Sequence, residues 1–571
     1  MSTKGKSPCL AVQRWEDAHT SLLSALTSYM DTCTNLKSSP LAELGANTED
    51  LVPRIERHIT SLGSFISCQV FQTRSVLSTT RNQLVSQIYA LPEEVLVEIF
   101  TQVIYHPIGD KHRYKYPSMR PDLQSIYGRL YNLVGVCSSW RSLAVRKKGF
   151  WSIVPIVEKC ECSGHLLEDV TERSLRRSGG TGLYIAIDSS YALPWLLRPL
   201  ISYGKHIQVL NIQTKSRRTL REVMSTLAVF SSPGMLSELS IYLKPITENE
   251  PPTDLDWEII EHPSQHQEQF KRILGSLRVL RIRVAHIGLY DISFTNLVDL
   301  QLEDIQFGYK PMFKRLLGAI SSALNLQYLR LASVSSIALQ DPNSTPQGTI
   351  NDDVLSILLP NLKQVYLSSM WFNDLETVFE SFVPGNEKWI LSLADYCMGV
   401  NVPGVFPKVT IQKLGLLFQG FNIDTLMLSG QSGENWLDGT ELFQLLKVVP
   451  TVTTLEMFLW DLDRQRWEAL TRPQDPGGHE VGSTWFPCIR NFHIYNSRII
   501  DEYGIQAVVT SHNVQRLRMG GFLASASDDY NPNTITDKDA ISVWLASNVS
   551  DFQLMGSYDA PESMVNRWRL W

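Results

Sequence analysis

The sequence lacks any uninterrupted apolar run of about 18 residues, the length that a transmembrane helix needs. It also lacks an apolar stretch of signal-peptide length after its polar start, Met1 to Pro8. We therefore expect a protein of the cytoplasm, the nucleus or both, with no membrane partner.

Cysteine and basic charge are both scarce. Eight cysteines are spread over 571 residues, a pattern that indicates reduced and largely buried thiols more than a disulfide framework. Lysine and arginine number 52 against 58 aspartate and glutamate residues, which gives a net charge of −6. Nucleic-acid binding usually needs a concentrated basic surface, so we do not expect nucleic acid as the main partner.

Common catalytic motifs are absent as well. The sequence contains no Gly-x-Ser-x-Gly elbow, no His-Glu-x-x-His helix and no Walker loop. Cys160, Cys162 and His165 offer three zinc ligands without a fourth at conventional spacing. Gly179 to Gly182 precedes a predicted strand, so it indicates a turn and not a phosphate loop. We expect no catalytic residue, no metal and no cofactor.

The composition, with 43% hydrophobic and 19% charged residues, permits several buried cores. We expect residues 1–47 to be polar and partly disordered. Residues 48–89 show a helical period through Ile55, Ile59, Leu62 and Ile66. Because the heptad register is often broken, a helix that packs on its own chain fits this segment better than a dimeric coiled coil, although both remain open.

Residues 91–103 predict a second kind of helix. Pro92 is tolerated at a helix start, and two glutamates follow in the first turn, where the helix dipole favours them. A wide apolar stripe then runs along the helix and contains Val95, Leu96, Ile99, Phe100 and Val103. A further helix is expected to carry Leu130, Leu133, Val134, Cys137, Trp140 and Ala144 on one face and to end near Gly149.

From about residue 153 onward the pattern changes to short strands. Ten segments have the form apolar-x-x-apolar-x-apolar, and they begin at Ile207, Leu236, Leu277, Leu297, Leu326, Leu362, Ile423, Val452, Ile489 and Val514. Residues 183–187 and 388–393 offer an opening and a weaker strand, and helical runs such as 312–320 and 441–447 separate some of the strands. Alternating short strands and helices predict an α/β fold of stacked repeats with a parallel sheet.

Three ordered motifs resemble the F-box. They are Leu-Pro-x-Glu-Val-Leu-x-Glu-Ile-Phe at 91–100, Val-Cys-Ser-Ser-Trp-Arg-x-Leu-Ala at 136–144, and Phe-Trp at 150–151. The whole chain resembles fungal F-box proteins with a leucine-rich-repeat-like tail, which implies an F-box at 90–152 and an irregular solenoid at 153–571. The segment between the first two motifs, about 101–130, is longer than in the usual F-box.

The resemblance implies a substrate-recognition adaptor of a Skp1–cullin–F-box ubiquitin ligase. Its partners would be a Skp1-like protein, the cullin–RING complex reached through it, and a protein substrate of unknown identity. The alternative is an F-box-containing interaction scaffold that acts outside a ubiquitin ligase. Matching positions imply a Skp1 site at Leu91, Pro92, Leu96, Ile99 and Phe100. The resemblance also implies that four more residues are shared between this contact and the F-box core, namely Val136, Cys137, Trp140 and Leu143.

The strands themselves predict a substrate-binding face. Four strands within 277–284, 297–303, 326–331 and 362–367 should lie side by side and parallel, with their Leu and Ile side chains in the core. The intervening positions would then face outward and bind substrate through Arg278, Arg281, Arg283, Tyr328 and Arg330. An equally good interpretation is that these side chains pair with one another across neighbouring strands and do not bind substrate, as Arg281 would with Gln301 or Glu303.

Overall fold

The structure is a computed structural model, and its described residues are 9–40, 48–106, 119–157, 166–179, 182–189, 194–244, 267–338, 355–430, 435–473, 485–523 and 533–561. They form two compact units, Met1–Leu96 and Val97–Trp571. The boundary falls within helix α3, Glu93–Tyr105, inside the range predicted as the F-box. Within the described residues, no helix is both long and apolar enough to cross a membrane.

The N-terminal unit is helical. Helix α1 covers Leu10–Ser38, where we expected a polar and partly disordered segment, and α2 covers Thr48–Val85, where the sequence predicts helix. A short 3-10 helix, η1, spans Gln87–Ala90. No residue of α1, and none of the residues of α2 from Asp50 onward, is buried. The expected packing of α2 on its own chain is therefore not seen in the described structure.

The C-terminal unit begins with helices. After α3 come α4, Met119–Val136, α5, Ser138–Arg146, and the 3-10 helix η2, Lys148–Trp151. The prediction of one continuous helix through residues 130–144 was wrong, because Cys137 is extended and begins a new helix as its N-cap, where its sulfur accepts from the Trp140 amide. The expected long insertion is also shorter, since α4 already starts at Met119.

A large and mostly parallel sheet follows, which confirms the predicted α/β class. It contains 16 of the described strands, is not closed into a barrel, and pairs antiparallel only at β17, Asn533–Thr534. Each of the ten predicted segments contains one strand: β3 Ile207–Thr214, β4 Glu238–Leu243, β5 Val279–Arg283, β6 Asp299–Glu303, β8 Tyr328–Ala332, β10 Gln364–Ser368, β12 Ile423–Ser429, β13 Thr454–Phe458, β15 Asn491–Ile499 and β16 Arg516–Leu523. The other strands of the sheet are β1 Ile153–Val157, β2 Leu183–Asp188, β11 Lys388–Leu393, β14 Asp461–Leu462 and β18 Asp551–Leu554, besides β17.

The four strands β5, β6, β8 and β10 lie side by side and parallel, as predicted. Their registers align the apolar positions, so that Leu280, Leu300, Leu329 and Val365 form one buried row. The next apolar row, two residues later in each strand, is buried in the same way. This alternation keeps the intervening side chains on the opposite face of the sheet.

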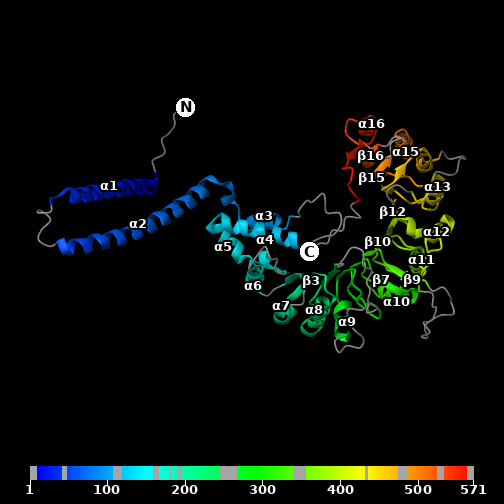
Figure 1. Ribbon diagram of the computed structural model, residues 1–571, viewed down its shortest axis with the longest axis horizontal. Helices are drawn as coiled ribbons and strands as arrows, with labels where there is room; N and C mark the ends of the chain where they lie inside the picture. Colours follow the sequence, from blue (N-terminus) through cyan, green and yellow to red (C-terminus); the bar gives the residue numbers. More distant parts are fainter. Residues whose placement is uncertain are drawn as a thin grey trace. The chain divides into compact units, whose positions relative to one another are not determined.

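Helices connect most of the strands and line one side of the sheet in Figure 1. They are α6 Leu166–Ser178, α7 Pro194–Tyr203, α8 Arg217–Phe230, α9 Gln267–Gly275, α10 Lys310–Ser321, α11 Phe372–Ser381, α12 Ile411–Leu417, α13 Gly439–Val448, α14 Arg464–Leu470, α15 Gly504–His512 and α16 Ala540–Asn548. Leu220, Val223 and Leu227 of α8 show the pattern, because their three- and four-residue spacing buries one helix face in the common core. A separate pair, β7 Gln306–Tyr309 and β9 Ser335–Ile337, lies in the connections.

The same backbone turn recurs at the carboxyl ends of the strands. The left-handed conformation is adopted by six residues other than glycine at equivalent positions: Val284, Asp304, Ser333, Ser369, Leu459 and Asn496. Several of these residues donate a backbone hydrogen bond to the next strand. The N–H of Asp304 donates to the carbonyl of Ala332 (2.9 Å), and the N–H of Ser333 donates to the carbonyl of Ser368 (2.8 Å). A left-handed residue with a Cβ costs about 1–2 kcal/mol, so these hydrogen bonds hold a strained repeat in place.

We predict opposite effects for two substitutions at Ser333, which has φ of 51°. Ser333→Gly should raise or leave unchanged the free energy of unfolding, because glycine adopts this conformation without steric cost. Ser333→Val should lower it by about 1–2 kcal/mol. Urea denaturation measures the free energy of unfolding of both variants. Lys363, whose backbone is not left-handed, is the control position. There the glycine variant should be less stable than the valine variant.

Candidate functional site

An aromatic core holds the helices of the predicted F-box segment together. The Phe100 ring of α3 lies 4.7 Å from the Trp140 ring of α5 and 6.4 Å from Phe150. The Trp151 indole donates to the Ala144 carbonyl at 2.8 Å, and the Arg177 guanidinium stacks over its ring at 4.2 Å. These contacts join α3, α5, η2 and α6 around one small core.

Apolar side chains remain uncovered on α3 and α4. Ile99 and Val103, one turn apart on α3, are 37% and 43% exposed, and Val136 at the end of α4 is 59% exposed. In the N-terminal unit, Leu91 and Pro92 are exposed and Leu96 is half-buried. Neighbouring exposed apolar residues such as Ile99 and Val103 are typical of protein-interaction surfaces.

Two of the predicted Skp1-contacting residues lie inside the molecule. Phe100 is 1% exposed, because it fills the space between Trp140 and Phe150, and Leu143 is also buried. The assignment of Phe100 to the interface is therefore corrected to a core position. Cys137 and Trp140 are half-buried, in agreement with a role shared between core and surface.

The predicted substrate-binding residues lie on β5 and β8, in a network of ion pairs that runs across strands. Arg281 contacts Asp299 at 2.9 Å and Glu238 at 3.8 Å. Arg330 contacts Glu303 at 2.6 Å and stacks over the Tyr366 ring at 4.0 Å. Neutralisation across strands is thus present, although Arg281 pairs with Asp299 and not with the expected Gln301 or Glu303.

Burial separates these residues into two groups. Arg283 is only 8% exposed, because it pairs with Asp304 at 2.8 Å and lies over the Tyr242 ring. The expectation that Arg283 faces outward is therefore wrong. Arg278 and Tyr328 are exposed, and they are the predicted residues best placed to contact a partner directly.

A cavity of about 500 Å³ opens beside the ion pairs. Its lining includes the paired Arg283 and Arg330 and two acidic partners, so its charges balance. Tyr558, far along the chain, also lines it and packs against the Phe522 ring at 5.4 Å. The C-terminal residues therefore contribute to the same strand-end surface, which sequence spacing did not reveal.

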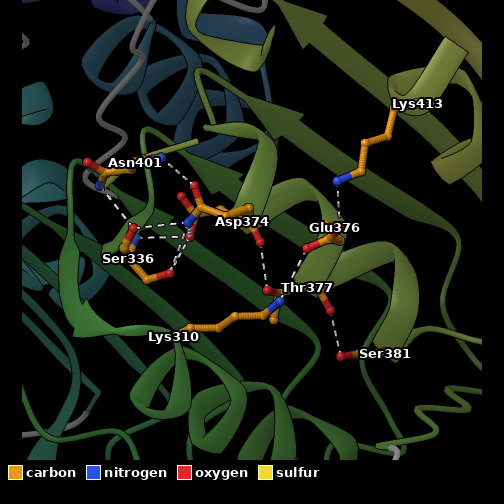
Figure 2. Close-up of polar contacts among 9 residues, drawn as sticks. Lys310, Ser336, Asp374, Glu376, Thr377, Ser381, Asn401 and Lys413 are labelled. Carbon is orange, nitrogen blue, oxygen red and sulfur yellow. Dashed lines mark hydrogen bonds and ion pairs between the residues drawn. The ribbon is translucent and has the colours of Figure 1, made fainter. Parts of the chain in front are cut away.

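A buried polar cluster lies between α11 and two connections (Figure 2). Oδ1 of Asp374 accepts three hydrogen bonds. The donors are the backbone N–H of Ser336 at 2.9 Å, the hydroxyl of Ser336, and the side-chain amide of Asn373 at 3.1 Å. The Asn401 amide side chain donates to the Ser336 carbonyl at 2.9 Å. Nearby, Glu376 pairs with Lys310 at 3.3 Å and with Lys413 at 3.9 Å. These bonds fasten β9 and the loop of Asn401 to α11.

Burial raises the pKa of Asp374 to about 7, although the Ser336 hydrogen bonds and the charge of Lys310 lower it. Its Oδ2 has no hydrogen-bond partner within the described structure. An acidic side chain with this environment is able to mark a reactive site. Here the neighbours are serine, asparagine and threonine from packed elements, and the described residues contain no group of metal ligands. The hydrogen bonds of the cluster hold these packed elements together.

The predicted absence of a zinc site concerns Cys160, Cys162 and His165, which lie outside the described residues. Comparison with known proteins adds no assignment, since no protein-family model and no curated protein matches this chain. The roles of the candidate sites are therefore inferred from their geometry alone.

We predict that Asp374 makes stability fall as pH rises. The folded protein holds a proton on this carboxyl up to about pH 7, whereas the unfolded chain releases it near its ordinary pKa of 3.8. The free energy of unfolding should therefore decrease between about pH 4 and pH 7 through this group and then level off. Asp374→Asn should flatten this decrease.

Urea denaturation at several pH values measures the effect. Glu380→Gln, which changes an exposed carboxylate on the same helix, is the matched control and should retain the wild-type slope. A wild-type slope in Asp374→Asn would show that the carboxyl is not protonated in the folded state.

Proposed function

We propose that the protein is the substrate-recognition adaptor of a Skp1–cullin–F-box ubiquitin ligase. In this proposal the helices around α3 bind a Skp1-like protein, and the repeat domain, an irregular leucine-rich-repeat-like solenoid, holds a protein substrate. One observation carries the proposal. A tight aromatic core around Phe100 fixes α3 and α5, while Ile99 and Val103 of α3 and Val136 at the end of α4 remain exposed.

This division between core and surface fits an adaptor. A helix whose apolar residues were needed only for its own fold would bury most of its stripe, as α8 does from Leu220 to Ala228. On α3, Phe100 and Ile104 are buried whereas Ile99 and Val103 are not. An exposed apolar patch with a rigid support is the arrangement that supplies binding energy with little loss of conformational entropy.

We predict that Ile99→Asp combined with Val103→Asp removes binding to a Skp1-like protein and leaves the fold intact. Each side chain is an apolar anchor, and the loss of such an anchor commonly costs about 2 kcal/mol or more. Co-precipitation measures recovery of the Skp1-like protein and of the cullin. The control is Leu324→Asp, which changes an exposed leucine of the repeat domain.

The outcomes separate the two candidate functions. Undiminished recovery of the Skp1-like protein by the double variant would contradict this interface. Recovery of the Skp1-like protein without any cullin from wild-type cells would favour an F-box-containing scaffold that acts outside a ligase. Recovery of both from the wild type, and of neither from the variant, supports the adaptor.

The strand face supports the second half of the proposal. Its arginines are held by carboxylates, so they present oriented polar groups at little cost in side-chain entropy. Tyr328 of β8 and Arg278, the residue before β5, are exposed. Mixed charge with an exposed aromatic residue is typical of surfaces that bind proteins.

We predict that stability and capture depend on different arginines of this face. Arg283→Met should lower the free energy of unfolding by about 1 kcal/mol, because it removes a buried guanidinium that pairs with Asp304 and lies over the Tyr242 ring. Arg278→Met combined with Tyr328→Ala should change it by less than about 0.5 kcal/mol, because both side chains are exposed.

Affinity purification with the proteasome blocked then measures capture. Proteins recovered with the wild type should be lost in the Arg278→Met, Tyr328→Ala variant. Their full recovery, with stability unchanged, would move the substrate site away from β5 and β8.

A further inference from the structure

Helix α2 presents a continuous apolar stripe that nothing covers in the described structure. Ile55 and Leu77 are 38% and 40% exposed, and Ile59 and Val70 are more exposed still. Leu62 and Ile66 at the middle are half-buried. The helix has 38 residues and is therefore about 57 Å long at 1.5 Å per residue. This surface is far larger than the scattered apolar residues of an ordinary protein surface.

The spacing of the stripe explains why it fits heptads poorly. Ile55, Ile66 and Leu77 recur at intervals of 11 residues, and Leu51 and Leu62 repeat the interval. Eleven residues make three turns of about 3.67 residues, close to the period of an undistorted helix. The stripe therefore stays on one face of a nearly straight helix along most of its length, which is suited to packing against another long helix.

The composition of α2 also requires a partner. The helix is rich in serine and threonine, whose hydroxyl groups bond back to carbonyl oxygens one turn earlier, as Thr60 does to Glu56 (2.9 Å) and Ser61 to Arg57 (2.7 Å). Such residues, together with Gly63 in the middle, have low intrinsic helix propensity. Long helices of this kind gain most of their stability from packing an apolar face.

Two pairs of apolar residues in the stripe are symmetric about Ile66. In an antiparallel pair centred on this residue, Ile55 of one helix lies opposite Leu77 of the other, Leu62 lies opposite Val70, and Ile59 lies opposite Thr73. Charges follow the same symmetry. At 100° per residue, Glu56 and Arg74 flank the same edge of the stripe at nearly equal distances from Ile66, so an antiparallel pair brings opposite charges together twice.

We propose that α2 is a homodimerisation helix, which packs antiparallel against α2 of a second copy of this chain with Ile66 on the two-fold axis. Ile55 then meets Leu77 and Leu62 meets Val70, each pair twice, and Glu56 of each copy lies near Arg74 of the other. A self-complementary surface of this kind is the requirement for a symmetric two-chain interface. The proposal is independent of Skp1 binding, because it uses only residues of α2.

Light scattering after size exclusion, on the full chain over a range of concentrations, tests the proposal. The wild type should have about twice the monomer mass of 64.7 kDa. Ile66→Glu should shift the protein to the monomer mass, because two carboxylates would face each other on the two-fold axis. The matched control is Phe71→Glu, since Phe71 is 75% exposed but lies on the opposite face of α2, and it should remain dimeric.

Charge exchange tests the direction of the pair. Glu56→Arg and Arg74→Glu should each weaken the dimer several-fold. The double variant Glu56→Arg, Arg74→Glu should restore the wild-type affinity. Only an antiparallel pair of α2 helices predicts this restoration. A wild-type monomer at every concentration would overturn the proposal and leave the stripe to α1 or another protein. A dimer that Ile66→Glu leaves intact would equally overturn it.

Discussion

The alignment of apolar rows across the parallel sheet is the constraint on which the rest of the structure depends. Each strand of the repeat domain places its buried residues opposite those of its neighbours, as Leu300 lies between Leu280 and Leu329. A shift of one residue in any strand would turn its leucines to the polar face and its charged residues into the core. The register is therefore strongly specified at every step of the array.

The polar face follows from this register. Since the rows align, the charged residues between them also align, and Arg281 comes to lie beside Asp299 of the next strand. The same alignment places the strained left-handed residues in one line at the strand ends, where Asp304 reaches back to Arg283. Packing of the core thus organises the surface that we propose for substrate.

The helices around α3 and the helix α2 differ in what their apolar residues do. On α3 a part of the stripe is used for the fold, with Phe100 held between Trp140 and Phe150, and the remainder is available to a partner. On α2 no side chain from Asp50 onward is buried, so the whole stripe is available. A rigid supported patch and a long uncovered helix suit two different kinds of partner.

The sequence alone determined the α/β class and the positions of ten strands, because a strand buried on one face needs apolar residues at fixed local spacing. It also located the start of α3 through Pro92. Only the tertiary structure decided that Phe100 and Arg283 are buried and that Tyr558 lines the cavity of β5 and β8. It also decided that the helix breaks at Cys137. The burial of Phe100 and Arg283 and the position of Tyr558 depend on side chains distant in the sequence, such as Trp140, Asp304 and Phe522, and local spacing carries no information about such contacts.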